Sequence, residues 1–94
     1  MIHEFSILVN ISVDDLLGRS RKKEIALHRA VYWWLLHRVG FSYAAIGRLN
    51  ERKHCSIRIA VIKIDFQVMH HVSDTMEIVD KVKHLIDEYK KVKL

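Results

Sequence analysis

The residues best suited to bind a ligand lie in one short stretch near the middle of the chain. Two cations precede three residues that can form hydrogen bonds, in the order Arg52, Lys53, His54, Cys55 and Ser56. At the start of a helix, cationic and histidine side chains suit the N7 and O6 acceptors of guanine, while a serine and free backbone amides suit a phosphate. The stretch therefore predicts contact with the major groove of duplex DNA.

A second basic segment lies earlier in the chain. Arg19, Arg21, Lys22 and Lys23 fill four of the five positions of 19–23, and no acidic residue separates them. Cations at this density repel one another unless an anion lies between them. The segment predicts contacts with phosphates or a narrow minor groove, and a solvated loop without a ligand is the alternative.

The charge is concentrated in the middle of the chain. The net charge is +5, but residues 19–58 hold ten lysines and arginines against two acidic residues, a net of +8. Residues 69–94 hold five lysines and five acidic residues, which cancel. A basic block beside a balanced tail is typical of a face that binds polyanions, and a solvated basic surface stays open as the other interpretation.

Catalytic and metal sites have little support. The chain holds no glycine-rich phosphate loop, no G-x-S-x-G and no H-E-x-x-H sequence. Its seven histidines lack the ligand spacing of a closed zinc site. His54 and Cys55 are adjacent, so on a helix they neither point at one metal nor face each other as a nucleophile pair. We therefore expect no enzyme activity, no metal, no cofactor and no small-molecule substrate.

The totals suit one small helical domain. We expect the 94 residues to form a single DNA-binding helix-turn-helix domain over 1–94, with a core in 10–70 and a C-terminal amphipathic helix over 74–93. The absence of proline and the presence of only three glycines favour an all-α fold of about five to six helices. The lone Cys55 and the lack of a signal peptide or membrane span predict a cytoplasmic protein.

The N-terminal elements must position the first basic segment. Residues 2–9 suit two helical turns or a strand equally well. Ser12 is placed to cap a short helical turn over 13–17, which Gly18 would end. The longest helix before the turn is predicted over 25–39, and because it is apolar nearly all round it should be central.

This central helix should bury two tryptophans. Trp33 and Trp34 point about 100° apart on a helix, and the core is the favoured place for both. Gly40 should end the helix, and Ser42 should cap the next one.

The second basic segment should sit in a helix-turn-helix. A short helix over 42–49 leads through a polar turn, 50–53, into a longer apolar segment. Gly47 is expected to let another backbone approach closely. Residues 57–68 alternate as a strand would, but the alternation changes phase after Val61, and a helical stripe is also present. We interpret this segment as the second helix.

The tail predicts one long amphipathic helix. Asp74 and Glu77 have the D-x-x-E spacing of a capping box. The tail should pack on the domain, with a dimer contact as the less favoured alternative, so we expect a monomer or a weak dimer. Its apolar stripe consists of Ile78, Val82, Leu85, Tyr89 and Val92. Its terminal cations are Lys90, Lys91 and Lys93.

Three stretches resemble a known family, the C-terminal DNA-binding domain (domain IV) of the bacterial replication initiator DnaA. Residues 11–25 are similar to its S-V-x-D-L-L…S-R basic-loop pattern. Residues 41–49 and 52–57 are similar to its I-G-x-x-F-G-G-R-D-H-S/T-T-V signature. The resemblance covers residues 10 to about 64. It implies a Trp-repressor-like helical domain that binds duplex DNA boxes as a monomeric unit.

The resemblance also implies roles for single residues. The basic-loop arginine that enters the minor groove falls on Arg21, and the signature arginine falls on Arg52. The major-groove histidine falls on His54, and the second Ser/Thr of the signature falls on Ser56.

Some positions carry other implications or depart from the family pattern. Lys22 and Arg29 match positions that would contact phosphate. The family's Asp before the histidine is Lys53 here, and its Ser/Thr after the histidine is Cys55. An Asp accepts a hydrogen bond from cytosine N4, whereas a Lys only donates, so we expect a site other than the standard DnaA box. Asn50-Glu51 replaces the Phe-Gly-Gly turn, and we expect Asn50 to take the left-handed conformation.

The leading hypothesis is sequence-specific binding of double-stranded DNA, related to recognition of replication-origin boxes. The alternative is a protein-interaction or regulatory module of a phage or mobile element that kept the fold but lost or changed DNA specificity, with Trp33, Trp34 and the C-terminal stripe as its contact surfaces. The chain opens with Met1 and carries no ATPase module, so we expect a stand-alone relative that does not melt an origin by itself. The predicted DNA contacts are Arg19, Arg21, Lys22, Lys23, Arg29, Arg52, Lys53, His54, Cys55 and Ser56.

Overall fold

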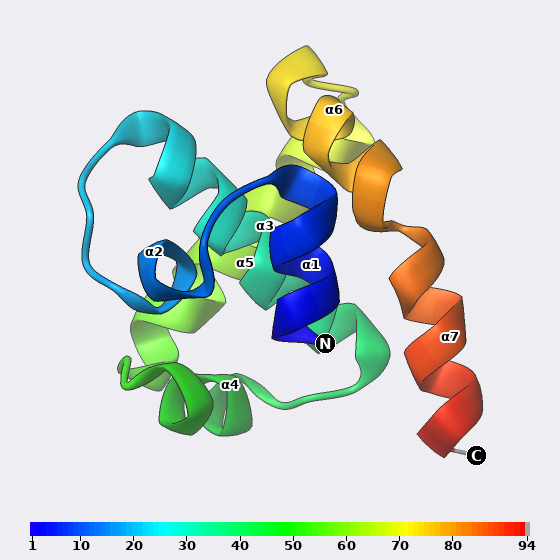
Figure 1. Cartoon of the computed structure of the whole chain (residues 1–94). Coiled ribbons are helices and arrows are strands. Elements are labelled where there is room, and N and C mark those ends of the chain that lie inside the picture. The colour runs from blue at the N-terminus through cyan, green and yellow to red at the C-terminus, as the bar shows by residue number, and fades with distance from the viewer. Residues whose placement is uncertain (94) are drawn as a thin grey trace.

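The computed structural model describes the backbone of residues 1–93 and the side chains of residues 1–90. This part of the chain contains helices and no strands, which confirms the all-α prediction, with one or two more helices than expected (Figure 1). The helices are α1 (Ile2–Val9), α2 (Val13–Leu17), α3 (Lys23–Val39), α4 (Tyr43–Asn50), α5 (His54–Met69), α6 (Ser73–Val82) and α7 (His84–Lys93). None of those described is long and apolar enough to cross a membrane.

Helix α3 forms the centre of the fold, as its sequence predicts. It packs against α5 most extensively and also contacts each of the other helices (Figure 1). Val31 and Leu35 are fully buried, and Trp33 and Trp34 are only 8% and 4% exposed. Both tryptophans therefore lie in the core, where their rings are not available as a contact surface.

The first segment is a helix and not a strand. Asn10 ends α1 in the left-handed conformation, with φ at 57°, which turns the chain back toward α2. Phe5 is fully buried, and its ring centroid lies 5.3 Å from that of Tyr32 on α3. This aromatic contact holds the start of the chain against the central helix.

Burial of Tyr32 makes the fold sensitive to alkali. Removal from water raises the pKa of the Tyr32 phenol from 10.0 to about 12, and the Glu4 carboxylate adds to the shift. The stability that the neutral phenol contributes is complete below pH 10 and is lost as the pH rises toward about 12. We expect the urea midpoint to fall across this window, and to fall less in Tyr32→Phe. An equal fall in both proteins would contradict the prediction.

Two serine caps begin the helices that flank α3, as predicted. The hydroxyl of Ser12 accepts a hydrogen bond from the amide of Asp15 at 3.1 Å, and that of Ser42 accepts one from the amide of Ala45 at 3.1 Å. Gly40 ends α3 with φ at 124°, a value that L side chains rarely adopt. These local signals fix where the elements before the turn begin and end.

The prediction of one C-terminal helix over 74–93 is wrong, because the chain bends at Lys83 into α6 and α7. The amide of Ile86 bonds the carbonyl of Lys83 at 3.1 Å, a tight i→i+3 closure. The bend lets the apolar stripe follow the core, where Val82 and Leu85 are buried. The part of the stripe that the structure describes therefore packs on the fold, as predicted, and α7 reaches α3.

Two details of the tail also differ from or fall outside the prediction. The D-x-x-E capping box does not form, because α6 begins at Ser73 with Val72 as its N-cap and no side-chain cap. Asp74 instead lies in the first helical turn. The predicted roles of the Lys91, Val92 and Lys93 side chains lie outside the described residues.

Candidate nucleic-acid interface

The turn between α4 and α5 depends on Gly47. The amide of Arg52 donates to the Gly47 carbonyl at 2.8 Å, which folds the turn back over α4. A Cβ added at position 47 would lie 2.5 Å from the Arg52 carbonyl oxygen. The prediction that another backbone approaches Gly47 closely is therefore confirmed, and the approaching backbone is that of the turn itself.

The left-handed residue of the turn is Glu51, with φ at 54°, and not Asn50 as predicted. Asn50 is the last residue of α4 and is 4% exposed. Its side-chain amide donates to the carbonyl of Ile46 at 2.8 Å, a bond that keeps Asn50 helical. The left-handed residue that reverses the chain after α4 is therefore one residue later than predicted, at the exposed Glu51.

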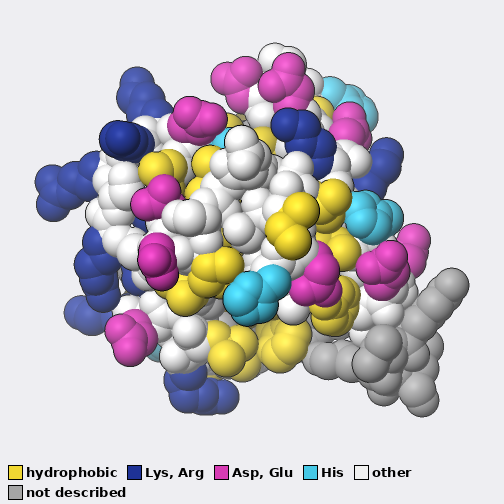
Figure 2. Space-filling model, in the orientation of Figure 1, with side chains coloured by type: hydrophobic (Ala, Val, Ile, Leu, Met, Phe, Trp, Pro, Cys, Tyr) yellow, Lys and Arg dark blue, Asp and Glu magenta, His cyan; other side chains and the backbone are white. Residues whose placement is uncertain are grey.

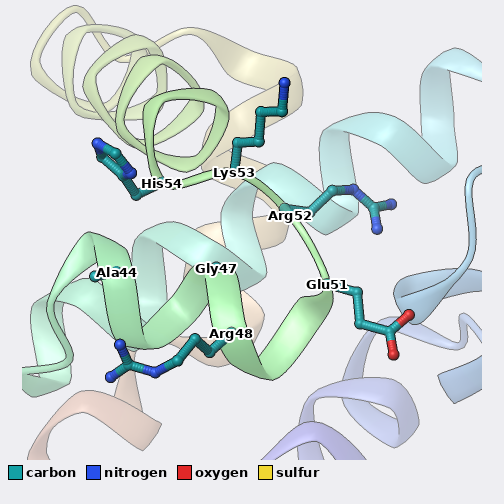
Figure 3. Close-up of a pocket in the computed structure, with 7 residues that line it drawn as sticks. All are labelled: Ala44, Gly47, Arg48, Glu51, Arg52, Lys53 and His54. Carbon is teal, nitrogen blue, oxygen red and sulfur yellow. The ribbon is translucent and has the colours of Figure 1, made fainter.

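The start of α5 presents polar groups to solvent. Lys53 is its N-cap and supplies no side-chain hydrogen bond, so its first amides lack a side-chain acceptor. The side chains of Lys53, His54, Cys55 and Ser56 are all exposed. Figure 3 shows Lys53 and His54 extending from the same edge of the groove between α4 and α5. A helix N-terminus with exposed donors suits a phosphate or a base edge.

Arg52 does not share this exposed position. Its guanidinium donates to the carbonyls of Gly18 at 2.5 Å and Asn50 at 3.0 Å, and lies 5.6 Å from the ring centroid of Trp33. Figure 3 shows it pointing away from Lys53 and His54. Burial lowers the pKa of Arg52, and so do the neighbouring guanidiniums. Arg52 therefore joins the turn to the segment after α2.

The side chain of Arg29 is also directed into the interior of the protein. It is 6% exposed, and its guanidinium donates to the carbonyls of Leu16 at 3.1 Å, Ser20 at 3.1 Å and Asp15 at 2.7 Å. Burial lowers its pKa, while the carboxylate of Asp15 opposes the shift. Arg29 thus shapes the end of α2 and the start of the basic loop, and it does not extend outward toward a phosphate.

The basic loop lies beside the turn of the helix-turn-helix. Arg19 donates to the carbonyl of Glu51 at 3.1 Å, which complements the bond from Arg52 to Gly18. Arg21, Lys22 and Lys23 are exposed. Figure 2 shows lysine and arginine side chains along the left edge of the molecule, the side on which Figure 1 places this loop and α4. The two basic segments therefore form one surface.

A family model for the bacterial DnaA protein helix-turn-helix matches residues 4–64, about two thirds of the chain. The chain belongs to this family. No solved structure matches it. Membership confirms the resemblance seen in the sequence and indicates a DNA-binding domain rather than a class of enzyme. The match ends within α5, so α6 and α7 lie outside it.

The DnaA-type helix-turn-helix brings most of the predicted contacts to one surface. Among the ten predicted residues, Arg29 is buried and Arg52 is half-buried, and both donate to backbone carbonyls, as does the exposed Arg19. The other eight are exposed, namely Arg19, Arg21, Lys22, Lys23, Lys53, His54, Cys55 and Ser56.

Arg48 was missing from the sequence prediction. It is exposed on α4 and lines the same groove as Lys53 and His54, from the opposite side (Figure 3). In a helix-turn-helix the first helix crosses the DNA backbone. A cation in the last turn of the first helix was the signal that could have indicated it.

Proposed function

We propose that this DnaA-type helix-turn-helix binds a specific duplex DNA sequence through the joined surface of the basic loop and the start of α5. The observation that supports this most directly is the pair of bonds from Arg19 to Glu51 and from Arg52 to Gly18. They fix the loop relative to the helix, so that one element can follow the minor groove while the other enters the major groove. The unneutralised cations on this surface favour a polyanion.

The exposed groups at the start of α5 favour guanine over cytosine. Lys53 donates and does not accept, so it suits guanine N7 and O6 and not the N4 amine of cytosine. His54 lies next to it with its ring exposed. Exposed Arg48 and the backbone amides at the start of α5 would bind phosphates. The preferred site would then differ from the standard DnaA box at the base pair that faces Lys53.

Fluorescence anisotropy would test this proposal with a DnaA-box duplex, a random-pool duplex and a scrambled duplex, each at two salt concentrations. Selection of a site from the random pool, with affinity falling steeply as the salt concentration rises, would support sequence-specific DNA binding. Equal binding to all three duplexes would reject sequence specificity. Absence of binding at low salt would reject DNA binding altogether.

Arg21→Ala and His54→Ala should each weaken binding to the selected site about tenfold or more, because each removes one groove contact worth roughly 1–3 kcal/mol. Both side chains are exposed, so the thermal unfolding midpoint should stay unchanged. The matched control is Lys81→Ala, which removes an exposed cation from α6. Equal affinity of all three variants and the wild type would overturn the assignment.

The protein-interaction alternative finds less support. Trp33 and Trp34 are buried, and Ile78, Val82 and Leu85 of the C-terminal stripe are covered by the fold. Most of the described residues that this hypothesis assigned to a partner are therefore covered within the chain itself, and Tyr89 is partly buried.

A further inference from the structure

Helix α5 has an apolar face that the fold does not cover. Ile57 and other inward residues are buried in the core. On the opposite side, Ile59 is 69% exposed, Ile62 is 48% exposed, Phe66 is 60% exposed and Met69 is 73% exposed. Residues 57–68 therefore hold more apolar residues than the buried face of the helix needs, and the exposed set accounts for the excess. It leaves a contiguous apolar strip on a helix that otherwise belongs to the core.

The spacing of this strip matches a helix–helix seam. Together with exposed Cys55, its residues recur at intervals of four, three, four and three, the a and d positions of two heptads. We call Cys55, Ile59, Ile62, Phe66 and Met69 the outer seam. A seam with this period packs against another helix, because knobs from each helix fill holes in the other.

The charges beside the outer seam select its orientation. Arg58 and Asp65 lie on one flank, and Lys63 lies on the other. One oxygen of the Asp65 carboxylate accepts a hydrogen bond from the Trp34 indole nitrogen at 2.6 Å, so the partner's Arg58 would add to an existing contact. None of the described contacts pairs Arg58 or Lys63 with an acidic group. In a parallel pair, Arg58 would face the partner's Lys63, a repulsive contact. In an antiparallel pair, residues of the same flank face each other, so Arg58 can face the partner's Asp65 twice.

The charges also select the register. Pairing Ile59 with the partner's Ile62 places Arg58 opposite the partner's Asp65 on both sides of the two-fold axis. A shift by one heptad would pair Ile62 with the partner's Phe66. That shift would bring Asp65 against the partner's Asp65 and Lys63 against the partner's Lys63, two contacts between like charges. Of these two registers, only the first is therefore complementary in charge.

We propose that the outer seam binds a second copy of this chain as an antiparallel α5–α5 pair, with Ile59 against the partner's Ile62 and Cys55 against the partner's Phe66. A stable interface buries about 800 Å² per partner, more than one strip on a helix of this length offers. The dimer is therefore weak and depends on concentration. Exposed Met69 lies beyond the paired stretch.

Sedimentation equilibrium between about 1 and 500 µM protein, without DNA, tests the dimer. The wild type should dimerise, and Ile62→Glu should raise the dimer dissociation constant at least about a hundredfold, because it places a carboxylate in the seam. The matched control is Ile7→Glu on α1, where the side chain is 80% exposed and away from the seam. A monomeric wild type, or equal loss of dimer in both variants, would overturn the proposal.

Disulfide trapping tests the orientation. Under mild oxidation, Phe66→Cys should yield a bond between Cys55 of one copy and the cysteine introduced at position 66 of the other, located by peptide mapping. Ile7→Cys, the control, should give no bond between positions 55 and 7. A bond joining Cys55 to the partner's Cys55 as the main product would overturn the antiparallel arrangement.

The dimer would cover the end of α5 proposed to read DNA, a consequence that rests on the proposed function. Because the partner's Phe66 lies on Cys55, duplex DNA should dissociate the wild-type dimer, and Ile62→Glu should bind the duplex without this competition. A complex that retains the α5–α5 dimer on DNA would overturn the exclusion. If the dimer forms but neither protein binds any duplex, the proposed function fails and the dimer stands.

Discussion

Arg29→Met should lower the free energy of unfolding by about 3 kcal/mol, the largest loss we expect from any single cation of this chain. The methionine keeps an apolar stem but removes the donors to three carbonyls, those of Leu16, Ser20 and Asp15. The Leu16 carbonyl is buried and has little water to replace the lost donor, while the carbonyls of Ser20 and Asp15 are partly buried. Urea unfolding followed by circular dichroism would measure the change.

Two further variants distinguish the effect of the planar guanidinium donors of Arg29 from the effect of its positive charge. Arg29→Lys keeps the charge but not the planar set of donors, so it should recover less than half of the loss. Arg48→Met removes an exposed arginine and should change stability by less than about 0.5 kcal/mol. If Arg29→Lys were as stable as the wild type, the three carbonyl bonds would not be the source of the stability.

Gly47→Ala should destabilise the protein by about 2–3 kcal/mol and reduce DNA affinity in parallel. In an ordinary helix interior the same change gains roughly 0.5–1 kcal/mol, because alanine has the better helix propensity. Here the new Cβ would meet the Arg52 carbonyl oxygen at 2.5 Å, a backbone atom that moves only if the turn moves. The expected change in stability therefore has the opposite sign to the change that helix propensity alone predicts.

The control for this variant is Ala44→Gly, one turn earlier on the exposed side of α4. Because Ala44 lies in the first turn of α4, the change should cost less than the roughly 1 kcal/mol of a helix interior, and it should leave the turn in place. Thermal unfolding and anisotropy on the same samples would compare the two variants. A Gly47→Ala protein more stable than the wild type would show that the turn is not held against α4.

The elements with strong local signals could be predicted from the sequence. Ser12 and Ser42 cap helices because their hydroxyls meet amides three residues on, an interaction that needs no distant partner. The central place of α3 follows from an apolar surface that extends around the helix. The exposed positions of Lys53 and His54 follow from the polar break before α5.

The interior roles of Arg29 and Arg52 could not be predicted in this way. Each guanidinium bonds carbonyls that tertiary folding brings near, from Asp15 and Gly18 among others. Spacing along the chain does not reveal such partners, and family resemblance placed both arginines on DNA. The bend at Lys83 could not be predicted either, because neither proline nor glycine marks it, and Leu85 just beyond it is buried in a core that only the folded chain reveals.

The packing of α3 against both ends of the chain has a consequence for synthesis. Phe5 of α1 and Leu85 of α7 belong to the same core, and the Tyr89 hydroxyl donates to the Glu4 carboxylate. A nascent chain carries α4 and α5 out of the ribosome before Leu85 is available to close this core. The helix-turn-helix therefore reaches its folded stability only after α7 has emerged, and chains stalled before that point expose α3 to chaperones and proteases.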